Sequence, residues 1–295
     1  MIQKDNSFVS NANRHSIEIE KTKVGEFAFD YNRKFNDERK SMSVSITTSI
    51  ENERQNTDIT SQSLDKNNIS IGNPYLQRTH NYEKGTISNA KWDYSFPVSP
   101  KGHIETGYKG IYRHINADYE SSDLINSVYI VNTAASNIFI FKEQVHGLYA
   151  LYNTSFNSKG NRDWKLDIGV RGEQVVNDGN TKTNSTSFSN SYFKFFPTAS
   201  LAYYVKPEEF WKFSYGKRIN RPGLGQLNPF IDITDSLNPH GGNPNLKPEI
   251  IHAFEFGYDK EWTNFTFSSN LFYRYSINTI RQYELQPNGA SQVFL

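Results

Sequence analysis

The sequence predicts an all-β chain: an antiparallel, up-and-down transmembrane β-barrel, present in part as about ten long strands of a larger barrel. Three observations predict this fold class. Apolar and polar residues alternate along many segments, the segments are longer than strands of ordinary globular proteins, and the connections between them alternate between short and long. We expect residues 1–295 to lie in one such barrel domain.

The alternation is clearest in the segment from Phe265 to Ile277, where most odd positions are apolar and most even positions are polar. Similar runs begin at Phe27, Trp92, Trp164 and Phe254. A period of two gives a strand one dry face and one wet face. We therefore expect one outward apolar face formed by Phe265, Phe267, Leu271, Tyr273, Tyr275 and Ile277. The opposite face should carry Thr266, Ser268, Asn270, Arg274 and Ser276.

The same pattern, read along the whole chain, gives ten strands that are long enough for a tilted crossing of a membrane, which takes about 9–11 residues. We place these strands at residues 15–33, 40–52, 79–97, 101–118, 137–155, 164–177, 191–205, 210–220, 249–259 and 264–282. A sustained helical stripe is absent.

The connections between these strands fall into two groups. The short ones are Arg33–Arg39, Pro97–Lys101, Asn157–Asp163, Lys206–Glu209 and Asp259–Asn264. The long ones are Glu51–Arg78, Tyr119–Ser136, Asn177–Asn190 and Arg221–Pro248. Outer-membrane barrels have tight periplasmic turns and longer outer loops, so we expect all short turns at one end of the sheet and all long loops at the other.

Composition agrees with this fold. Aromatic residues make up 15% of the chain although the mean hydropathy is −0.69. A barrel combines both features because lipid-facing and lumen-facing residues alternate and the loops are polar. The net charge of +1 gives no reason to expect nucleic acid, and the absence of cysteine excludes disulfides, thiolate metal sites and thiol catalysis.

No apolar stretch is long enough for a transmembrane helix, and residues 1–13 show no signal-peptide pattern. We therefore expect Met1 to lie inside a longer protein, with the signal peptide and further domains outside this sequence. Trp164, Trp211 and Trp262 sit at or beside short turns, and Trp92 lies a few residues before another. Indole rings prefer the membrane interface, so these positions predict an aromatic girdle at the short-turn end.

The segment Arg221–Pro248 is the most distinctive connection because it carries five prolines. Prolines restrict the unfolded chain, and the apolar residues Phe230, Ile231, Ile233, Leu237 and Leu246 allow the segment to pack on itself. We expect an ordered loop at the barrel rim, closed at its base by an ion pair between Arg218 or Arg221 and Glu249. The candidate ligand-side residues are Arg218, Arg221, Asn228, Phe230, His240, Asn243 and Asn245.

Other chemistry is not indicated. The glycines at Gly223 and Gly225 are not followed by a helical pattern, so they do not predict a phosphate cradle. The histidines lack zinc-site spacing, and Glu208 and Glu209 form a charged turn rather than an acid–base pair. We predict no catalytic residue, no cofactor and no metal site. The charged residues of the strands, for which we predict a hydrated lumen wall, are Lys91, Asp93, Lys165, Asp167, Arg171, Glu255 and Arg274.

Three motifs from Trp211 onward carry a family resemblance: Ser214–Pro222, Leu227–Phe230 and Gly242–Glu249. They resemble the series S-Y-x-x-R-I-x-R-P, L-N-P-F and G-N-P-x-L-K-P-E of the outer-membrane β-barrel family, which is close to the TonB-dependent receptors of Bacteroidetes-type bacteria. Further segments resembling the same family are Asp93–Pro97, Glu105–Lys109, Phe141–Val145, Gly169–Glu173 and Phe195–Thr198.

The resemblance implies a location in the bacterial outer membrane and a barrel of about 22 strands, of which this chain holds part. It also implies a receptor that takes up an unidentified ligand across that membrane. Its partners would be outer-membrane lipid, its own plug domain outside this chain, and the TonB complex acting through the plug. Two alternatives stay open: a structural or adhesion barrel without transport, and a soluble β-sandwich that binds sugar.

Overall fold

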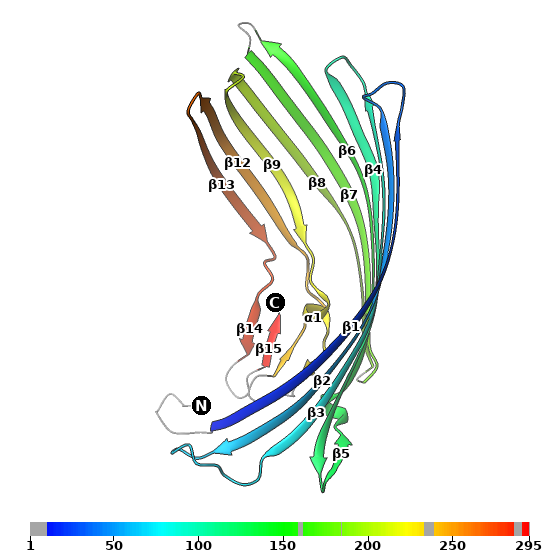
Figure 1. Cartoon of the computed structure of the whole chain (residues 1–295), viewed down its shortest axis with the longest axis vertical. Coiled ribbons are helices and arrows are strands. Elements are labelled where there is room, and N and C mark those ends of the chain that lie inside the picture. Colours follow the sequence, from blue (N-terminus) through cyan, green and yellow to red (C-terminus); the bar gives the residue numbers. More distant parts are fainter. Residues whose placement is uncertain (1–10, 159–161, 184, 233–238, 286–290, 295) are drawn as a thin grey trace.

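Ten long antiparallel strands form one curved sheet in the computed structural model, which describes residues 11–158, 162–183, 185–232, 239–285 and 291–294 (Figure 1). In sheet order these strands are β1 (Asn11–Lys34), β2 (Ser41–Leu64), β3 (Tyr75–Pro97), β4 (Gly102–Ile125), β6 (Asn137–Ser158), β7 (Arg162–Thr181), β8 (Thr186–Lys206), β9 (Glu209–Asn220), β12 (Glu249–Trp262) and β13 (Phe265–Ile277). Each long strand pairs with its neighbour in the chain order of the ten, which confirms the up-and-down meander.

The remaining elements are short. They are β5 (Val128–Val131), β10 (Ile231–Asp232), β11 (His240–Gly241), β14 (Gln282–Leu285), β15 (Ser291–Phe294), the 3-10 helix η1 (Thr133–Ala135) and the single-turn helix α1 (Leu224–Leu227). β5 extends β4 as a hairpin, and β10, β11, β15 and β14 form a small second sheet. Among the described residues, no helix has the length and apolar character needed to cross a membrane.

The continuous register brings apolar residues of distant strands onto one face. One cross-strand row consists of Tyr31, Val44, Trp92, Tyr108 and Leu148. Another consists of Phe156, Trp164, Tyr203, Trp211 and Tyr258. We call this the outward face. A row of the opposite, inward face consists of Asp30, Ser45, Lys91 and Lys109, as the lumen-wall prediction requires.

β13 follows the predicted alternation. Its pairing with β12 is unbroken from Phe265 to Ile277, and Tyr273 packs on Phe254 of the outward face. The predicted division of this segment into apolar and polar faces is therefore confirmed. Leu271, on the apolar face, is 72% exposed, which is the exposure expected for a side chain whose solvent is lipid.

The short turns lie together at one end of the sheet, at the top of Figure 1, and the long connections lie at the other. Trp211 and Asn220 stand near opposite ends of β9, which confirms the predicted topology. All four tryptophans lie on the outward face toward the short-turn end, and Trp211 packs against Tyr258 with 4.3 Å between ring centroids. The predicted placement of the tryptophans near the short turns is therefore confirmed.

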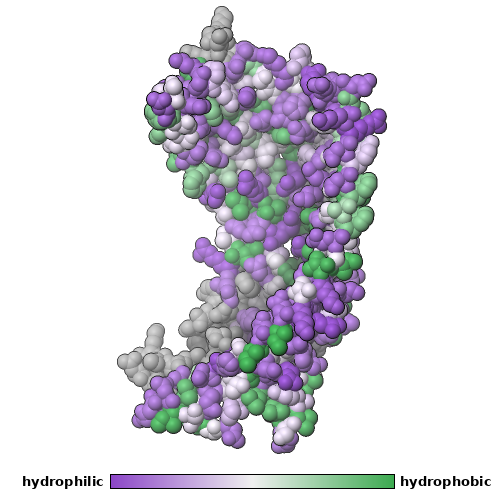
Figure 2. Space-filling model, in the orientation of Figure 1, coloured by the Kyte–Doolittle hydropathy of each residue, from purple (hydrophilic) through white to green (hydrophobic). Residues whose placement is uncertain are grey.

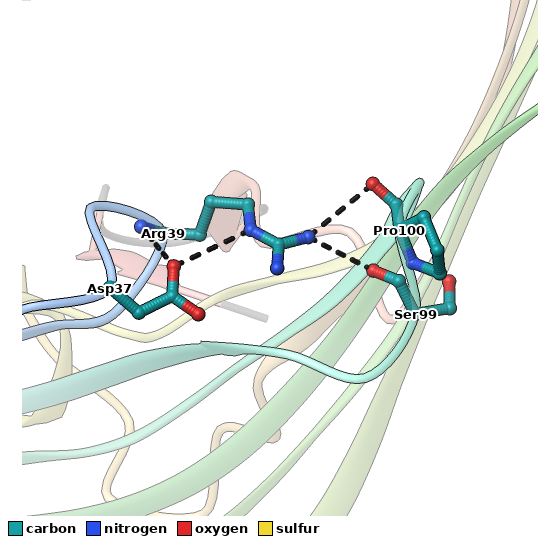
Figure 3. A network of polar contacts seen from close by, with 4 residues as sticks. All are labelled: Asp37, Arg39, Ser99 and Pro100. Carbon is teal, nitrogen blue, oxygen red and sulfur yellow. Dashed lines mark hydrogen bonds and ion pairs between the residues drawn. The ribbon is translucent and has the colours of Figure 1, made fainter.

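Two neighbouring short turns are tied together by Arg39 (Figure 3). Its Nη1 donates to the carbonyl oxygens of Ser99 at 3.1 Å and Pro100 at 3.3 Å, while its backbone N–H donates to Asp37. That backbone hydrogen bond holds the pKa of the Asp37 carboxyl below its ordinary value. The contacts link the β1–β2 turn to the β3–β4 turn.

Three of the four predicted long loops are wrong in extent. Most of Glu51–Arg78 is strand, because β2 continues to Leu64 and β3 begins at Tyr75. Tyr119–Ser136 contains the end of β4, β5 and η1, and Asn177–Asn190 is shortened to a tight turn between β7 and β8. The strands continue beyond the membrane, where neither face meets lipid, so the apolar alternation that marks a strand fades there. The predicted strand 264–282 also ends early, at Ile277.

Candidate functional site

The segment between β9 and β12 folds onto the inward face of the sheet at the end away from the short turns. Leu227, 1% exposed, packs against Phe139 and Phe141, which lie on the inward face of β6. Phe188, Leu224 and Leu246 complete this cluster. Because apolar residues from both sides are buried here, the segment is anchored to the wall and does not stand free above the rim.

Backbone hydrogen bonds fold the segment back on itself. The N–H of Gly242 donates to the Asn228 carbonyl and that of Asn243 to the Gln226 carbonyl, both at 2.7 Å. Gly242 lies so close to this backbone that a Cβ atom there would stand 2.6 Å from the carbonyl oxygens of Asn228, Gln226 and Gly225. Only glycine fits such an approach.

α1 follows Gly223 directly, so the expectation that no helix follows these glycines is wrong in detail. The helix is one turn long and is held by the Gln226 side chain, whose Oε1 accepts from the Gly223 N–H at 2.9 Å. The sequence showed no helical stripe here because a single turn is too short to produce one.

Arg221 anchors the start of the segment to the wall. Its guanidinium forms an ion pair and hydrogen bond with Glu173 on the inward face of β7, and Glu173 also meets Arg171 at 2.8 Å. The predicted ion pair of Arg218 or Arg221 with Glu249 is wrong. Glu249 instead accepts from Asn220 Nδ2 at 3.2 Å, because the folded segment turns Arg221 inward toward the buried Glu173.

A recess of about 250 Å³ lies between the folded segment and the inward face of β3, β4 and β6. The wall contributes Glu83, Tyr119 and Asn137, and the segment contributes Asn228 and His240. Asn137 is 3% exposed, and its Oδ1 finds no hydrogen-bond partner among the described residues. Burial raises the pKa of the Glu83 carboxyl, and the neighbouring Glu53 and Glu51 raise it further.

The predicted ligand-side residues do not all line this recess. Asn228, Phe230 and His240 line the recess, and His240 Nε2 lies 3.9 Å from an Asp232 carboxylate oxygen. Asn243 and Asn245 form a turn, in which the Asn245 N–H donates to Asn243 Oδ1 at 2.9 Å, and they do not line the recess. Ile233 and Leu237, which we expected to pack within the loop, lie outside the described residues.

Arg218 lines a different recess, of about 580 Å³, nearer the short-turn end of the inward face. Lys91, Lys109 and Arg171 contribute further cations to it. Lys91 and Lys109 lie directly opposite each other on β3 and β4, and Lys91 also pairs with Asp93 at 2.7 Å. Arg218 and Arg221 are therefore three residues apart in sequence but serve separate parts of the wall.

The wall residues of the first recess, including Glu83, Tyr119 and Asn137, were not among the predicted site residues. Period-two alternation places Glu83 on the inward face, but no sequence signal indicates which part of the wall the long segment will cover. In the described part of the chain, no group of three or more His, Asp or Glu residues is arranged to hold a metal ion.

Comparison with known families gives one extensive match. The family model described as "Outer membrane protein beta-barrel family" matches residues 33–295. Comparison with curated proteins finds no significant match.

Solved structures with similar folds include the copper transporter OprC, with a TM-score of 0.51 and 10% identity over 93% of this chain and 48% of that one. The ferric citrate transporter FecA has a TM-score of 0.49 and 12% identity over 80% of this chain and 34% of that one. The FrpB iron transporter from Neisseria meningitidis has a TM-score of 0.45 and 11% identity over 93% and 48%. The chain thus spans about a third to a half of the length of these structures, and at these identities the likeness concerns the fold.

Proposed function

The chain belongs to the outer membrane protein beta-barrel family and lies in the bacterial outer membrane, and from this premise we propose that it is part of a TonB-dependent receptor that takes up a ligand across that membrane. In this proposal the lumen side of the wall is the inward face, and the recess beneath the Arg221–Pro248 segment is where ligand is first held. The plug domain and TonB would act outside this chain.

One observation carries the proposal: the recess at the mouth of the wall is lined by Asn137, whose buried Oδ1 has no hydrogen-bond partner among the described residues. Buried polar groups are nearly always hydrogen-bonded, so an unpaired one in a recess is a position for a ligand donor. A barrel with only a structural role has no need for such a site. The donors and acceptors of Tyr119, Asn228 and His240 surround the same space.

We propose binding and passage rather than catalysis. The neighbours in fold are transporters by description, and energy for passage would come from the proton-motive force through TonB. What this chain's own residues contribute is a fixed inward wall, a folded segment that narrows the mouth, and polar groups that hold the ligand there.

The role as a receptor is tested by photo-crosslinking between TonB and the full-length protein in living cells of the source bacterium. We expect a TonB adduct of the full-length protein. If the protein is present in the outer membrane at its normal level and forms no adduct, a structural or adhesion barrel becomes the better account.

The recess is tested with Asn137→Leu and His240→Ala in the full-length protein, with Asn245→Ala as a control outside the recess. Uptake of ferric citrate and of copper, the cargoes named for two of the similar structures, is measured in intact cells. For a cargo that the wild type imports, we expect the recess variants to lower uptake about 10-fold, as loss of a buried hydrogen bond does, and the control to leave it unchanged. Equal uptake by all variants would show that the recess does not bind the ligand during uptake.

A further inference from the structure

Four basic side chains gather on the outward face of β1, β2 and β3, just beyond the apolar band. The register pairs Lys21 with Arg54 and places Lys23 one row nearer the membrane, in the same row as Lys84. We call Lys21, Lys23, Arg54 and Lys84 the outer basic cluster. Asn52 and Tyr82 fill the other positions of these two rows on the three strands, and on β4 the rows continue with Asn116 and Asp118. Asp118 is the one acidic residue in these rows across β1 to β4.

The cluster lies at the depth where the membrane ends. Between the rows of Arg33 and Lys23, the outward positions of these three strands carry no charged side chain and include Tyr31, Ile46 and Trp92. Lys23 and Arg33 are ten residues apart on β1, or about 33 Å along a strand. At a tilt of about 45° this rise covers about 23 Å, close to the apolar band of about 25 Å in such barrels. Lys23 and Lys84 therefore mark the outer boundary of the band.

These cations are not held in ion pairs by the described part of the chain. All four are exposed, and none makes an ion pair within 4.0 Å with another described residue. Arg54 lies over the Tyr82 ring, 5.3 Å from its centroid. The carboxylates nearest in sequence, such as Glu20 and Glu53, occupy the alternate positions of their strands and so belong to the inward face.

We propose that the outer basic cluster binds the phosphate groups of a phosphorylated lipid in the outer leaflet of the outer membrane. At this depth the apolar band meets the headgroups, where phosphates are the anions available to long basic side chains. Lys and Arg extend their charged ends toward such a boundary, and the Arg54 guanidinium can hold two phosphate oxygens at once. The proposal rests on the membrane location alone and is independent of ligand uptake.

The test uses the full-length protein purified in an uncharged detergent and titrated with diphosphorylated lipid A. One variant combines Lys21→Gln, Lys23→Gln, Arg54→Gln and Lys84→Gln. A control variant, with the same loss of charge elsewhere, combines Lys34→Gln, Lys66→Gln, Lys194→Gln and Lys212→Gln. We expect the cluster variant to weaken binding at least about 10-fold, since each basic group near a charged membrane surface contributes measurably, and the control to bind as the wild type does.

Two further measurements identify the bound group. The wild type should bind lipid A from which the phosphates have been removed at least about 10-fold more weakly, and inorganic phosphate at equal phosphate concentration should not displace the lipid. Equal affinity of wild type and cluster variant, equal affinity for dephosphorylated lipid A, or displacement by inorganic phosphate would each overturn the proposal. If the fourfold variant does not migrate as a folded barrel, the pair Lys23→Gln and Lys84→Gln is measured in its place, with the same expectation.

Discussion

Gly242 occupies the tightest backbone position of the segment between β9 and β12. A methyl group there would meet three carbonyl oxygens at 2.6 Å, whereas a Cβ at Gly225 meets no atom within 4 Å. We expect Gly242→Ala to destabilise the folded segment by about 1–3 kcal/mol, the usual cost of forcing extra volume into a packed site. Gly225→Ala should leave it intact. Limited proteolysis of the full-length protein in native outer membranes checks this, and equal cutting of the two variants would contradict the packing described.

The pair between Arg221 and Glu173 fixes the start of the same segment. Glu173 is 7% exposed, so loss of Arg221 leaves a buried carboxylate with Arg171 as its remaining partner. We expect Arg221→Gln to destabilise the folded segment by about 1–3 kcal/mol. The double variant Arg221→Gln/Glu173→Gln should cost less than the sum of the two single changes. Thermal unfolding of the segment, followed by protease sensitivity, measures the coupling. Arg218→Gln is the control, and an additive cycle would show that the pair contributes nothing.

At the scale of elements, the sequence predicts the strands well where one face meets lipid. The turn ends of β7, β9 and β13 were placed within a few residues because apolar and polar solvents impose a period of two. The outer half of β2 and the first four residues of β3 were missed, since residues such as Thr57, Asp58 and Gln77 have water or protein on both sides and need no alternation. In these parts the sheet is extended by backbone hydrogen bonds to the neighbouring strands and not by a sequence pattern.

The candidate site was predictable only in part for a related reason. Asn228, Phe230 and His240 could be selected because they lie in an unusual proline-rich segment. Glu83 and Asn137 lie in the wall that this segment covers, and the wall is far from the segment in sequence. Contact between the segment and β6 depends on how Leu227 meets Phe139 and Phe141, and this is a tertiary match without a local signal. The Arg221 partner was mistaken for the same reason.

The extension of β3 beyond the membrane should respond to pH through Glu83. Its pKa is raised by burial and by Glu53 and Glu51, so the folded state binds the proton more tightly than the unfolded state does. The loss of stability that comes from ionising Glu83 in the folded state is absent below the ordinary carboxyl pKa. It grows as the pH rises through the raised pKa and is complete above that pKa. We expect amide exchange of residues 75–85, corrected for its intrinsic pH dependence, to be slower at pH 5 than at pH 7.

Glu83→Gln should remove this difference and slow exchange of the same residues at pH 7, while Glu38→Gln, in a short turn at the other end, should have no effect. The measurement is hydrogen–deuterium exchange of the full-length protein read by mass spectrometry. Unchanged pH dependence in Glu83→Gln would show that this carboxyl does not limit the stability of the extension.

At the scale of the whole molecule, one sheet separates two environments. The outward face carries large exposed apolar residues on its long strands, with fewer of them on β4 than on the others; examples are Phe29, Leu148 and Phe213. Hydrophilic residues prevail over most of the face seen in Figure 2. So much contiguous apolar surface exceeds what a soluble monomer exposes. The location in the outer membrane accounts for it, because the solvent of the outward face is lipid.

The most direct test of this account is a scan of β13 with single cysteines carrying spin labels, since this chain contributes no native cysteine. The full-length protein is reconstituted in bilayers, and the accessibility of each label from position 265 to 277 to lipid-dissolved oxygen is compared with its accessibility to a water-soluble nickel chelate. We predict a period of two, with oxygen reaching Leu271, Tyr273 and Tyr275 more readily than Asn270, Arg274 and Ser276. A scan without that period, or one with Arg274 facing lipid and Tyr273 shielded from it, would contradict the barrel assignment.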